Sequence, residues 1–276
     1  MEIWYFSGTG NSRRVAQDIG AALDARLFDI ARRKDGPVAT KAEALGIVFP
    51  VYFEALPEAV EQFARHLNAP KTAYIFAVCT YGGAAGVAIK QLRRELARGG
   101  LKLSAAYGVP MPQNSFRKPK ENRQKLMDKW NRRLVQITAR THKREKGSRG
   151  FNRPVEAVIR LLYPIMIRPA VVKQLSRLSG LPRSAPMGQL INHADASYTV
   201  NGACTGCGLC ADECPVGNIA MEEGTPVWQG RCELCTRCYH ICPQKAILGG
   251  VVAPGFYYEP DGLALSGNET QIHGTV

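Results

Sequence analysis

The chain lacks any long hydrophobic run. The longest uncharged apolar run in its middle, Leu161 to Ile167, is far shorter than the roughly 20 apolar residues that a membrane-spanning helix needs. Its first residues, Met1 to Phe6, run directly into a strand-like pattern with no basic stretch followed by an apolar one, so we expect no secretory signal peptide. The composition, 45% hydrophobic and 21% charged, excludes wholesale disorder. We therefore expect a folded protein in the reducing cytoplasm.

Two kinds of functional signature are also missing. No G-x-G-x-x-G follows a strand pattern, so a dedicated NAD(P)H-binding domain is not supported. The five histidines are scattered, and no His, Glu or Asp constellation resembles an acid–base site. We therefore predict no catalytic residue from the sequence.

Cysteine, by contrast, is concentrated in one short stretch. Eight of the nine cysteines lie between Cys204 and Cys242, and such density in a reducing compartment indicates metal binding rather than disulfides. They form two runs of the spacing C-x2-C-x2-C-x3-C, each followed by a proline, and the second run starts 28 residues after the first. The two runs are Cys204, Cys207, Cys210 and Cys214, and Cys232, Cys235, Cys238 and Cys242.

This repeat resembles the bacterial two-cluster ferredoxins over about residues 197 to 249. Structural zinc fits less well, because it usually pairs two C-x-x-C knuckles across a longer gap. The resemblance implies two 4Fe-4S clusters. The first three cysteines of each run lie on one tight loop and reach three corners of one cube, while the fourth serves the other cluster. The expected ligand sets are Cys204, Cys207, Cys210 and Cys242 for one cluster, and Cys232, Cys235, Cys238 and Cys214 for the other.

A turn rich in Gly, Ser and Thr follows the first predicted strand, Glu2 to Phe6, and precedes a helical pattern. Strand, turn and helix together hold a phosphate well, because backbone amides and the helix N-terminus point at the anion. The turn lacks the lysine of a Walker A loop. It resembles the phosphate loop of flavodoxins, which binds the phosphate of FMN without a cation. Its residues are Ser7, Gly8, Thr9, Gly10, Asn11 and Ser12.

Two more predicted strands, Leu45 to Phe49 and Thr72 to Val78, end in loops that carry aromatic and glycine residues. In an open α/β sheet such loops meet at one edge, where ligands bind. The resemblance to flavodoxins implies that two tyrosines flank the isoalloxazine ring and that two glycines bring amides to its N5 and O4 region. The expected FMN contacts in these loops are Pro50, Tyr52, Phe53, Thr80, Tyr81, Gly82 and Gly83.

The alternation of strand and helix patterns predicts the α/β class with a parallel sheet. We expect a doubly wound, five-stranded flavodoxin-like sheet of order 2-1-3-4-5 and, behind it, a small α+β bacterial ferredoxin domain. The predicted boundaries are 1–140 for the FMN-binding domain, 141–190 for a basic helical linker, 191–250 for the ferredoxin domain and 251–276 for a C-terminal tail.

The positive charge of the chain is local. Residues 113–183 hold 19 Lys plus Arg and 4 Asp plus Glu, a net of +15 in a chain whose net is +13. Part of this segment reads as a last helix of the flavodoxin-like domain, because Leu126, Trp130, Leu134 and Ile137 recur at helical spacing. A second apolar stripe follows at Val155, Val158, Ile159 and Leu162.

Three uses of the basic segment stay open. It could be a packed linker with a solvated face, a docking surface for an acidic redox protein, or a contact with an anionic membrane surface. Nucleic-acid binding is not expected, since no recognised motif accompanies the charge.

As a whole, the chain resembles fusions of a flavodoxin-like domain with a two-cluster ferredoxin domain. The resemblance implies an electron-transfer iron–sulfur flavoprotein that passes electrons between two 4Fe-4S clusters and FMN, converting one-electron into one- or two-electron transfer. Its partner would be a redox protein that acts as donor or acceptor. The alternative is an oxidoreductase whose flavin reduces a small organic acceptor such as a quinone, fed by a low-potential ferredoxin-type donor.

Overall fold

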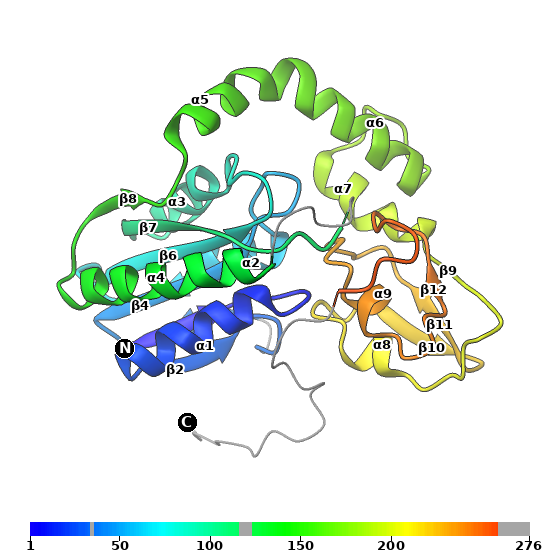
Figure 1. The fold of residues 1–276 in the computed structure, drawn as a ribbon, viewed down its shortest axis with the longest axis horizontal. Coiled ribbons are helices and arrows are strands. Elements are labelled where there is room, and N and C mark those ends of the chain that lie inside the picture. Colours follow the sequence, from blue (N-terminus) through cyan, green and yellow to red (C-terminus); the bar gives the residue numbers. More distant parts are fainter. Residues whose placement is uncertain (34–35, 116–122, 259–276) are drawn as a thin grey trace.

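The computed structural model describes residues 1–33, 36–115 and 123–258 (Figure 1). A parallel sheet with helices on both faces forms the N-terminal part, and a small unit of short helices and hairpins carries the clustered cysteines. A helical arch passes above both (Figure 1). The strands of the sheet are β1 (Glu2–Tyr5), β2 (Arg26–Asp29), β4 (Ala44–Pro50), β6 (Tyr74–Tyr81), β7 (Leu103–Pro110) and β8 (Gly147–Arg149).

The sheet has the order β2-β1-β4-β6-β7-β8, and every neighbouring pair is parallel. The first five strands confirm the predicted order 2-1-3-4-5. The predicted count of five is wrong, because β8 adds a sixth strand beside β7. This strand is Gly-Ser-Arg and so lacks the β-branched and aromatic residues by which a strand is recognised in a sequence.

Helices cover both faces of the sheet. On one face lie α1 (Asn11–Leu23) and α4 (Arg123–His142), and on the other lie α2 (Glu58–Arg65) and α3 (Ala88–Arg98). The helix predicted around Trp130 is α4. Its indole is fully buried and donates to Asp18 of α1 over 2.6 Å.

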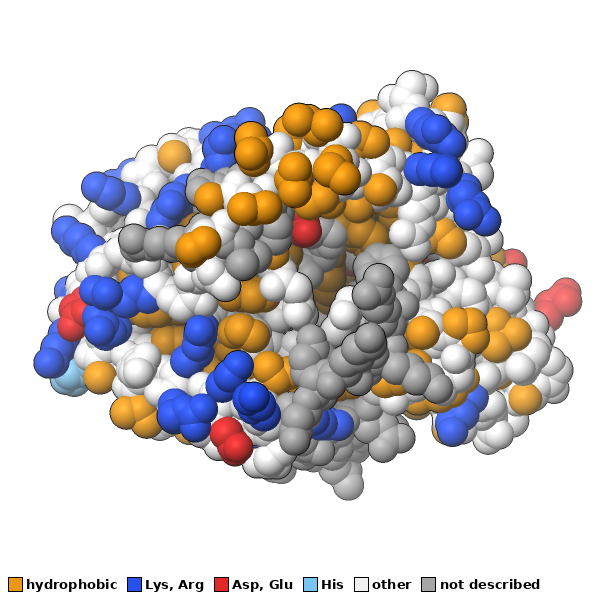
Figure 2. Space-filling model, turned by 45° about the horizontal axis from the view of Figure 1, so that its top comes forward, with side chains coloured by type: hydrophobic (Ala, Val, Ile, Leu, Met, Phe, Trp, Pro, Cys, Tyr) orange, Lys and Arg blue, Asp and Glu red, His pale blue; other side chains and the backbone are white. Residues whose placement is uncertain are grey.

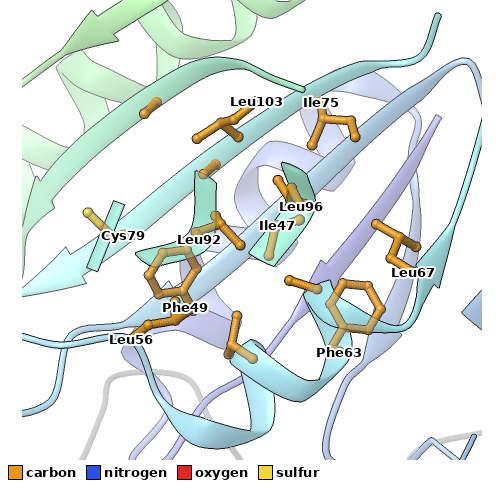
Figure 3. Close-up of a cluster of buried hydrophobic side chains, with 14 of the residues drawn as sticks. Ile47, Phe49, Leu56, Phe63, Leu67, Ile75, Cys79, Leu92, Leu96 and Leu103 are labelled. Atoms are coloured by element: carbon orange, nitrogen blue, oxygen red, sulfur yellow. The ribbon is translucent and has the colours of Figure 1, made fainter. Parts of the chain in front are cut away.

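The central strands are buried on both sides, as a doubly covered parallel sheet requires. Figure 3 shows one of the two resulting cores, in which Ile47, Phe49 and Ile75 of the sheet meet Phe63 of α2 and Leu92 of α3. A cysteine, Cys79, lies in this core with no exposed surface, as its place in an apolar strand indicates. The two cores fix the strand ends, and these position the loops of the site.

The small cysteine-bearing unit is built from two interleaved halves. Its elements are β9 (Thr199–Val200), α8 (Leu209–Asp212), β10 (Ile219–Glu222), β11 (Thr225–Trp228), α9 (Arg237–Ile241) and β12 (Ile247–Leu248). The sequence repeat of 28 residues relates β9 to the end of β11, α8 to α9, and β10 to β12. Pairing crosses between the halves: β12 pairs with β9, and β10 with β11.

The arch runs through α5 (Arg153–Leu162), the π-helix η1 (Tyr163–Ile167) and α6 (Arg168–Ser179). It leads into α7 (Met187–Asn192) and the 3-10 helix η2 (His193–Ser197), and a small parallel pair joins β3 (Val38–Ala39) to β5 (Leu67–Asn68). Two members of the predicted apolar stripe, Val155 and Ile159, have side chains that the structure does not describe. Residues 116–122 of the basic segment and 259–276 of the tail also lie outside the described residues. Within the part that is described, no helix combines the length and the apolar character needed to cross a bilayer.

Candidate functional site

A cavity of about 240 Å³ opens at the carboxyl edge of the sheet. Four loops of the sheet meet there, one after each of β1, β4, β6 and β7, as parallel strands dictate. Among its described lining residues none is Lys or Arg, so an anion would be held by neutral donors. Such a cavity suits a phosphate held by hydroxyl and amide groups and does not suit a cluster of anionic groups.

The turn after β1 has the backbone shape of an anion-binding loop. Gly10 adopts φ 105°, a conformation that glycine tolerates, and its N–H donates to Ser7 Oγ over 3.2 Å. Helix α1 starts at the next residue, so its unpaired N-terminal amides face the cavity edge. The Ser12 and Thr80 hydroxyls, 2.8 Å apart and buried, tie this turn to the loop after β6.

Close packing leaves room only for glycine at the second position of the turn. A Cβ built on Gly8 would lie 2.5 Å from Tyr52 Oη and 2.6 Å from the Cβ of Cys235. Burial raises the pKa of Tyr52 well above its ordinary value, so its phenol stays neutral. The next two residues, Phe53 and Glu54, both have positive φ, of 49° and 61°. Strained non-glycine residues of this kind gather at functional sites.

The predicted FMN contacts converge on this cavity. Gly10 forms the turn behind it, and the other twelve residues line it: Ser7, Gly8, Thr9, Asn11, Ser12, Pro50, Tyr52, Phe53, Thr80, Tyr81, Gly82 and Gly83. Their convergence supports the predicted flavin site, although it stays a prediction until a ligand is bound.

Several lining residues are missing from the sequence prediction. The loop after β7, residues 111–115, forms a fourth wall, and its Asn114 side chain donates to Thr9 Oγ1. Pro110 and Pro112, at the end of β7, are a usable signal in the sequence, since the loop after a parallel strand must lie at the same edge. Leu234, Cys235 and Val251 also line the cavity, but they come from the C-terminal unit and no local pattern marks them.

The first expected set of cysteines surrounds one small cavity. Its described lining includes four cysteines, three from the first run and one from the second: Cys204, Cys207, Cys210 and Cys242. The pKa of Cys210 is raised by burial and by its neighbours Cys242 and Cys207. This cavity lies near the surface, with Cys207 exposed.

The second expected set is buried deeper. Burial raises the pKa of the Cys235 thiol to about 12, and the nearby Cys214 raises it further. Burial likewise raises the pKa values of Cys232 and Cys238, on which neighbouring cysteines act in the same direction. The structure thus gathers both crossed sets of sulfurs. Iron would have to displace protons from these thiols, as metal binding to cysteine does.

Cluster-binding loops need a particular backbone shape, and both runs have it. Gly206 and Gly208 have φ of 70° and 76°, and the residues 28 positions later, Leu234 and Thr236, have 50° and 62°. Backbone amides also donate to sulfur, with Leu234 N donating to Cys232 Sγ over 3.2 Å. Such N–H···S contacts are characteristic around iron–sulfur clusters. Among the described residues no three His, Cys, Asp or Glu side chains meet at the spacing of a single metal ion.

The two sites share a wall. Cys235 and Leu234 of the second cysteine loop line the large cavity. Arg237 Nη1 donates over 2.7 Å to the Gly8 carbonyl in the turn of residues 7–12, which we call the phosphate turn. Its Nη2 pairs with Glu213. The buried Glu233 accepts from the first backbone amide of α2 over 3.1 Å and from the second over 2.6 Å. The second cysteine loop is therefore docked against the cavity by charge-assisted hydrogen bonds.

The last described residues of the chain, up to Tyr258, also contact the wall shared by the large cavity and the second cysteine loop. His240 Nε2 donates to the Asn114 carbonyl over 2.7 Å, and its Nδ1 accepts from the Tyr258 amide over 3.1 Å. Both bonds require the neutral ring with its proton on Nε2, and burial lowers the pKa of His240 to about 4. The Tyr258 hydroxyl donates to Asn11 Oδ1 over 2.6 Å. The C-terminal segment thus links the cysteine unit to the phosphate turn.

Comparison with known proteins agrees with this geometry. Residues 2–109 match a family model described as a flavodoxin domain, and residues 189–247 match one described as a 4Fe-4S dicluster domain. Together with the fold, the matches define an electron-transfer iron–sulfur flavoprotein. The chain is a fusion of a flavodoxin domain with a 4Fe-4S dicluster ferredoxin domain, which confirms the resemblance seen in the sequence.

Individual relatives are similar over shorter stretches or at lower identity. Over 45 residues the chain is 47% identical to one subunit of the ion-translocating oxidoreductase complex of Methanosarcina acetivorans, a match that covers 16% of this chain and only 17% of that protein. A candidate flavoprotein from Bacteroides eggerthii is 17% identical, with a TM-score of 0.32 over 49% of this chain and 96% of that one. A short-chain flavodoxin associated with a bacterial microcompartment is 14% identical, with a TM-score of 0.30 over 50% and 97%. The two structures add nothing to the assignment made by the family models.

Proposed function

We propose that the protein passes electrons between two 4Fe-4S clusters and one FMN, and so converts single-electron transfer into one- or two-electron transfer. The observation that carries the proposal is the shared wall, in which Leu234 and Cys235 of the second cysteine loop line the cavity proposed for the flavin. When bound, each cluster exchanges one electron at a time and the flavin exchanges one or two. The chain's own part is to hold these groups close together and out of water.

Each group has its own proposed residues. The phosphate of FMN is held by the amides and hydroxyls of residues 7–12, while Tyr52 and Tyr81 flank the ring and Gly82 and Gly83 bring amides to it. One cluster is bound by Cys204, Cys207, Cys210 and Cys242, and the other by Cys232, Cys235, Cys238 and Cys214.

The burial of the two cysteine sets supports an order of transfer. The set that contains Cys235 adjoins the flavin cavity and is the proximal one. The set that contains the exposed Cys207 is distal, and a redox protein would exchange electrons there. The similarity of a short stretch to part of an oxidoreductase complex supports such a protein partner.

The first experiment is cofactor stoichiometry on protein purified without oxygen. We expect about eight iron atoms, as many acid-labile sulfides and one FMN per chain, because each pair of motifs specifies two four-iron clusters. Iron without flavin, and none bound after FMN is added, would overturn the flavin part of the proposal.

The order of transfer is tested by two matched cysteine variants, Cys207→Ala and Cys235→Ala. Each should lower iron to about four atoms per chain, in accordance with one lost cluster, and retain FMN. The flavin is then photoreduced in each variant, and the absorbance of the remaining cluster reports electron transfer. We expect the wild-type rate in Cys207→Ala and a rate at least about tenfold lower in Cys235→Ala, because only the former keeps the ligand that lines the cavity. Equal rates in the two variants would contradict the proposed order. Steady turnover with a quinone would instead identify a reductase.

A further inference from the structure

A strip of exposed aliphatic side chains runs along the helical arch. Of the ten large hydrophobic residues that are exposed among the described ones, five fall within residues 158–166. They are Val158, Leu161, Leu162, Ile165 and Met166, exposed by 55, 71, 36, 72 and 62%. Their spacing of i, i+3, i+4, i+7 and i+8 places them along one side of a helix. Single exposed hydrophobic residues need no explanation, but a contiguous strip of this kind marks an interaction surface.

The arch is fixed at both ends, so the strip is held in one orientation. Before it, Phe151 packs on the core of the flavodoxin sheet, and after it the fully buried Leu175 belongs to the core of the ferredoxin domain. Between them Tyr163 is half-buried, and its pKa is raised by burial and by the nearby Glu54. The inner side of the arch therefore faces the body of the protein, and the aliphatic strip is left on the outside.

The charge around the strip is of one sign. From Ala157 to Arg183 the chain has five Lys or Arg residues and no Asp or Glu. Arg168, Lys173 and Arg177 are exposed on α6, directly after the strip. Figure 2, which brings the top of the arch forward, shows hydrophobic side chains gathered over it with Lys and Arg beside them. A surface that receives this face must accept aliphatic side chains and supply negative charge.

We propose that the arch is a docking surface for an anionic phospholipid bilayer, with the aliphatic strip inserted among the acyl chains and the α6 cations on the headgroups. An amphipathic helix with a basic side binds membranes in this way, lying in the interface without crossing it. The arch bulges away from the body of the protein (Figure 1), and hydrophobic side chains gather over it in the space-filling view (Figure 2). A protruding ridge of this kind can enter a soft bilayer without a matching groove. An acidic protein partner would need such a groove to bury the same side chains.

The experiment is vesicle flotation of the full chain, purified without oxygen with its cofactors. Phosphatidylcholine vesicles with phosphatidylserine are compared with vesicles of phosphatidylcholine alone. We expect binding to the anionic vesicles that weakens at high salt, because surface charge is screened. The double variant Leu161→Ser/Ile165→Ser should lower binding by at least about tenfold, since two inserted aliphatic side chains are lost.

The matched control is Val135→Ser, which removes an aliphatic side chain exposed by 68% on α4, away from the arch. It should bind like the wild type, and circular dichroism and iron content should show that all variants are folded. The proposal would be overturned if the protein bound neutral vesicles as well as anionic ones, or if Val135→Ser lost as much binding as the double variant. It would also be overturned if light scattering showed a dimer that the double variant separates, because a second copy would then cover the strip.

Discussion

One half-buried tryptophan, Trp228, lies beside the cysteine set proposed as proximal. Trp228 stacks on Tyr198, with ring centroids 5.2 Å apart and an interplanar angle of 18°. Its indole nitrogen is buried and makes no hydrogen bond within ordinary limits among the described residues. It lies close enough to the Cys238 thiol to lower the pKa of that thiol, against the larger raising effect of burial. An N–H directed at a cluster sulfur stabilises the added negative charge of the reduced state.

We therefore predict that Trp228→Phe lowers the reduction potential of the proximal cluster. Phenylalanine keeps the aromatic stack and removes only the donor. A hydrogen bond worth about 1 kcal/mol corresponds to about 40 mV for one electron, and a shift of this order is expected. A potentiometric titration followed by electron paramagnetic resonance measures it. Trp4→Phe, which removes an indole that donates to Glu2 in the flavodoxin domain, is the control and should leave both cluster potentials unchanged.

Residue types with a local chemical signature could be predicted from the sequence. The phosphate turn was recognisable because Gly, Ser and Thr supply the turn and the donors within six consecutive residues. Leu234 could not be recognised as a cavity residue, because it acquires that place only when the two domains dock. In the same way, nothing local distinguishes Trp228 from any other core aromatic residue.

At the scale of elements, helix α1 sets the geometry of the phosphate turn and ends at an unfavourable residue. Its C-cap, Asp24, has φ 48° and ψ 53°, and its amide donates to the Gly20 carbonyl. Glycine is the residue best suited to this left-handed position. A carboxylate there also repels the negative end of the helix dipole.

Replacing this residue should stabilise the flavodoxin domain. We expect Asp24→Gly to raise the free energy of unfolding by about 1 kcal/mol, because it relieves both the backbone strain and the charge. Asp24→Asn separates the two causes, since it removes the charge and keeps a side chain, and about half the gain is expected. Urea unfolding followed by circular dichroism measures both variants. A loss of stability in Asp24→Gly would show that the aspartate makes a favourable contact.

Long, strongly patterned elements were predictable for a physical reason. The buried strands β4 and β6 show as apolar runs because both faces of the sheet are covered, and α4 shows as an apolar stripe because one side packs on α1. The strand β8 has neither property, and its place depends on the edge of β7. The three-residue signal was therefore too weak to reveal the sixth strand.

At the scale of the whole molecule, the docking of the two domains decides how well the proposed electron path works. Arg237 connects the carbonyl of Gly8 in the phosphate turn with Glu213 in the ferredoxin domain. The side chain is largely buried, so little water can reach it to replace these hydrogen bonds, and breaking them costs free energy.

We predict that Arg237→Gln weakens this docking and slows electron transfer between flavin and proximal cluster by roughly threefold or more, since a hydrogen bond to a charged group contributes about 1.5–3 kcal/mol. Iron and FMN contents should stay unchanged. The photoreduction experiment described above measures the rate. Arg231→Gln is the matched control, because among the described residues the side chain of this exposed arginine bonds within the ferredoxin domain, to Gly217 and Gln229. A slowing of similar size in the control would place the cause elsewhere.

The crossed strand pairs of the ferredoxin domain have a consequence for its inheritance. Each half of the repeat contributes its last cysteine to the sulfur set of the other, and each strand pair takes one strand from each half. The repeat is therefore a unit of sequence without being a unit of structure. Deleting either half would remove three sulfurs from one set and one from the other, so neither half could be lost or exchanged by recombination while the other kept its cluster.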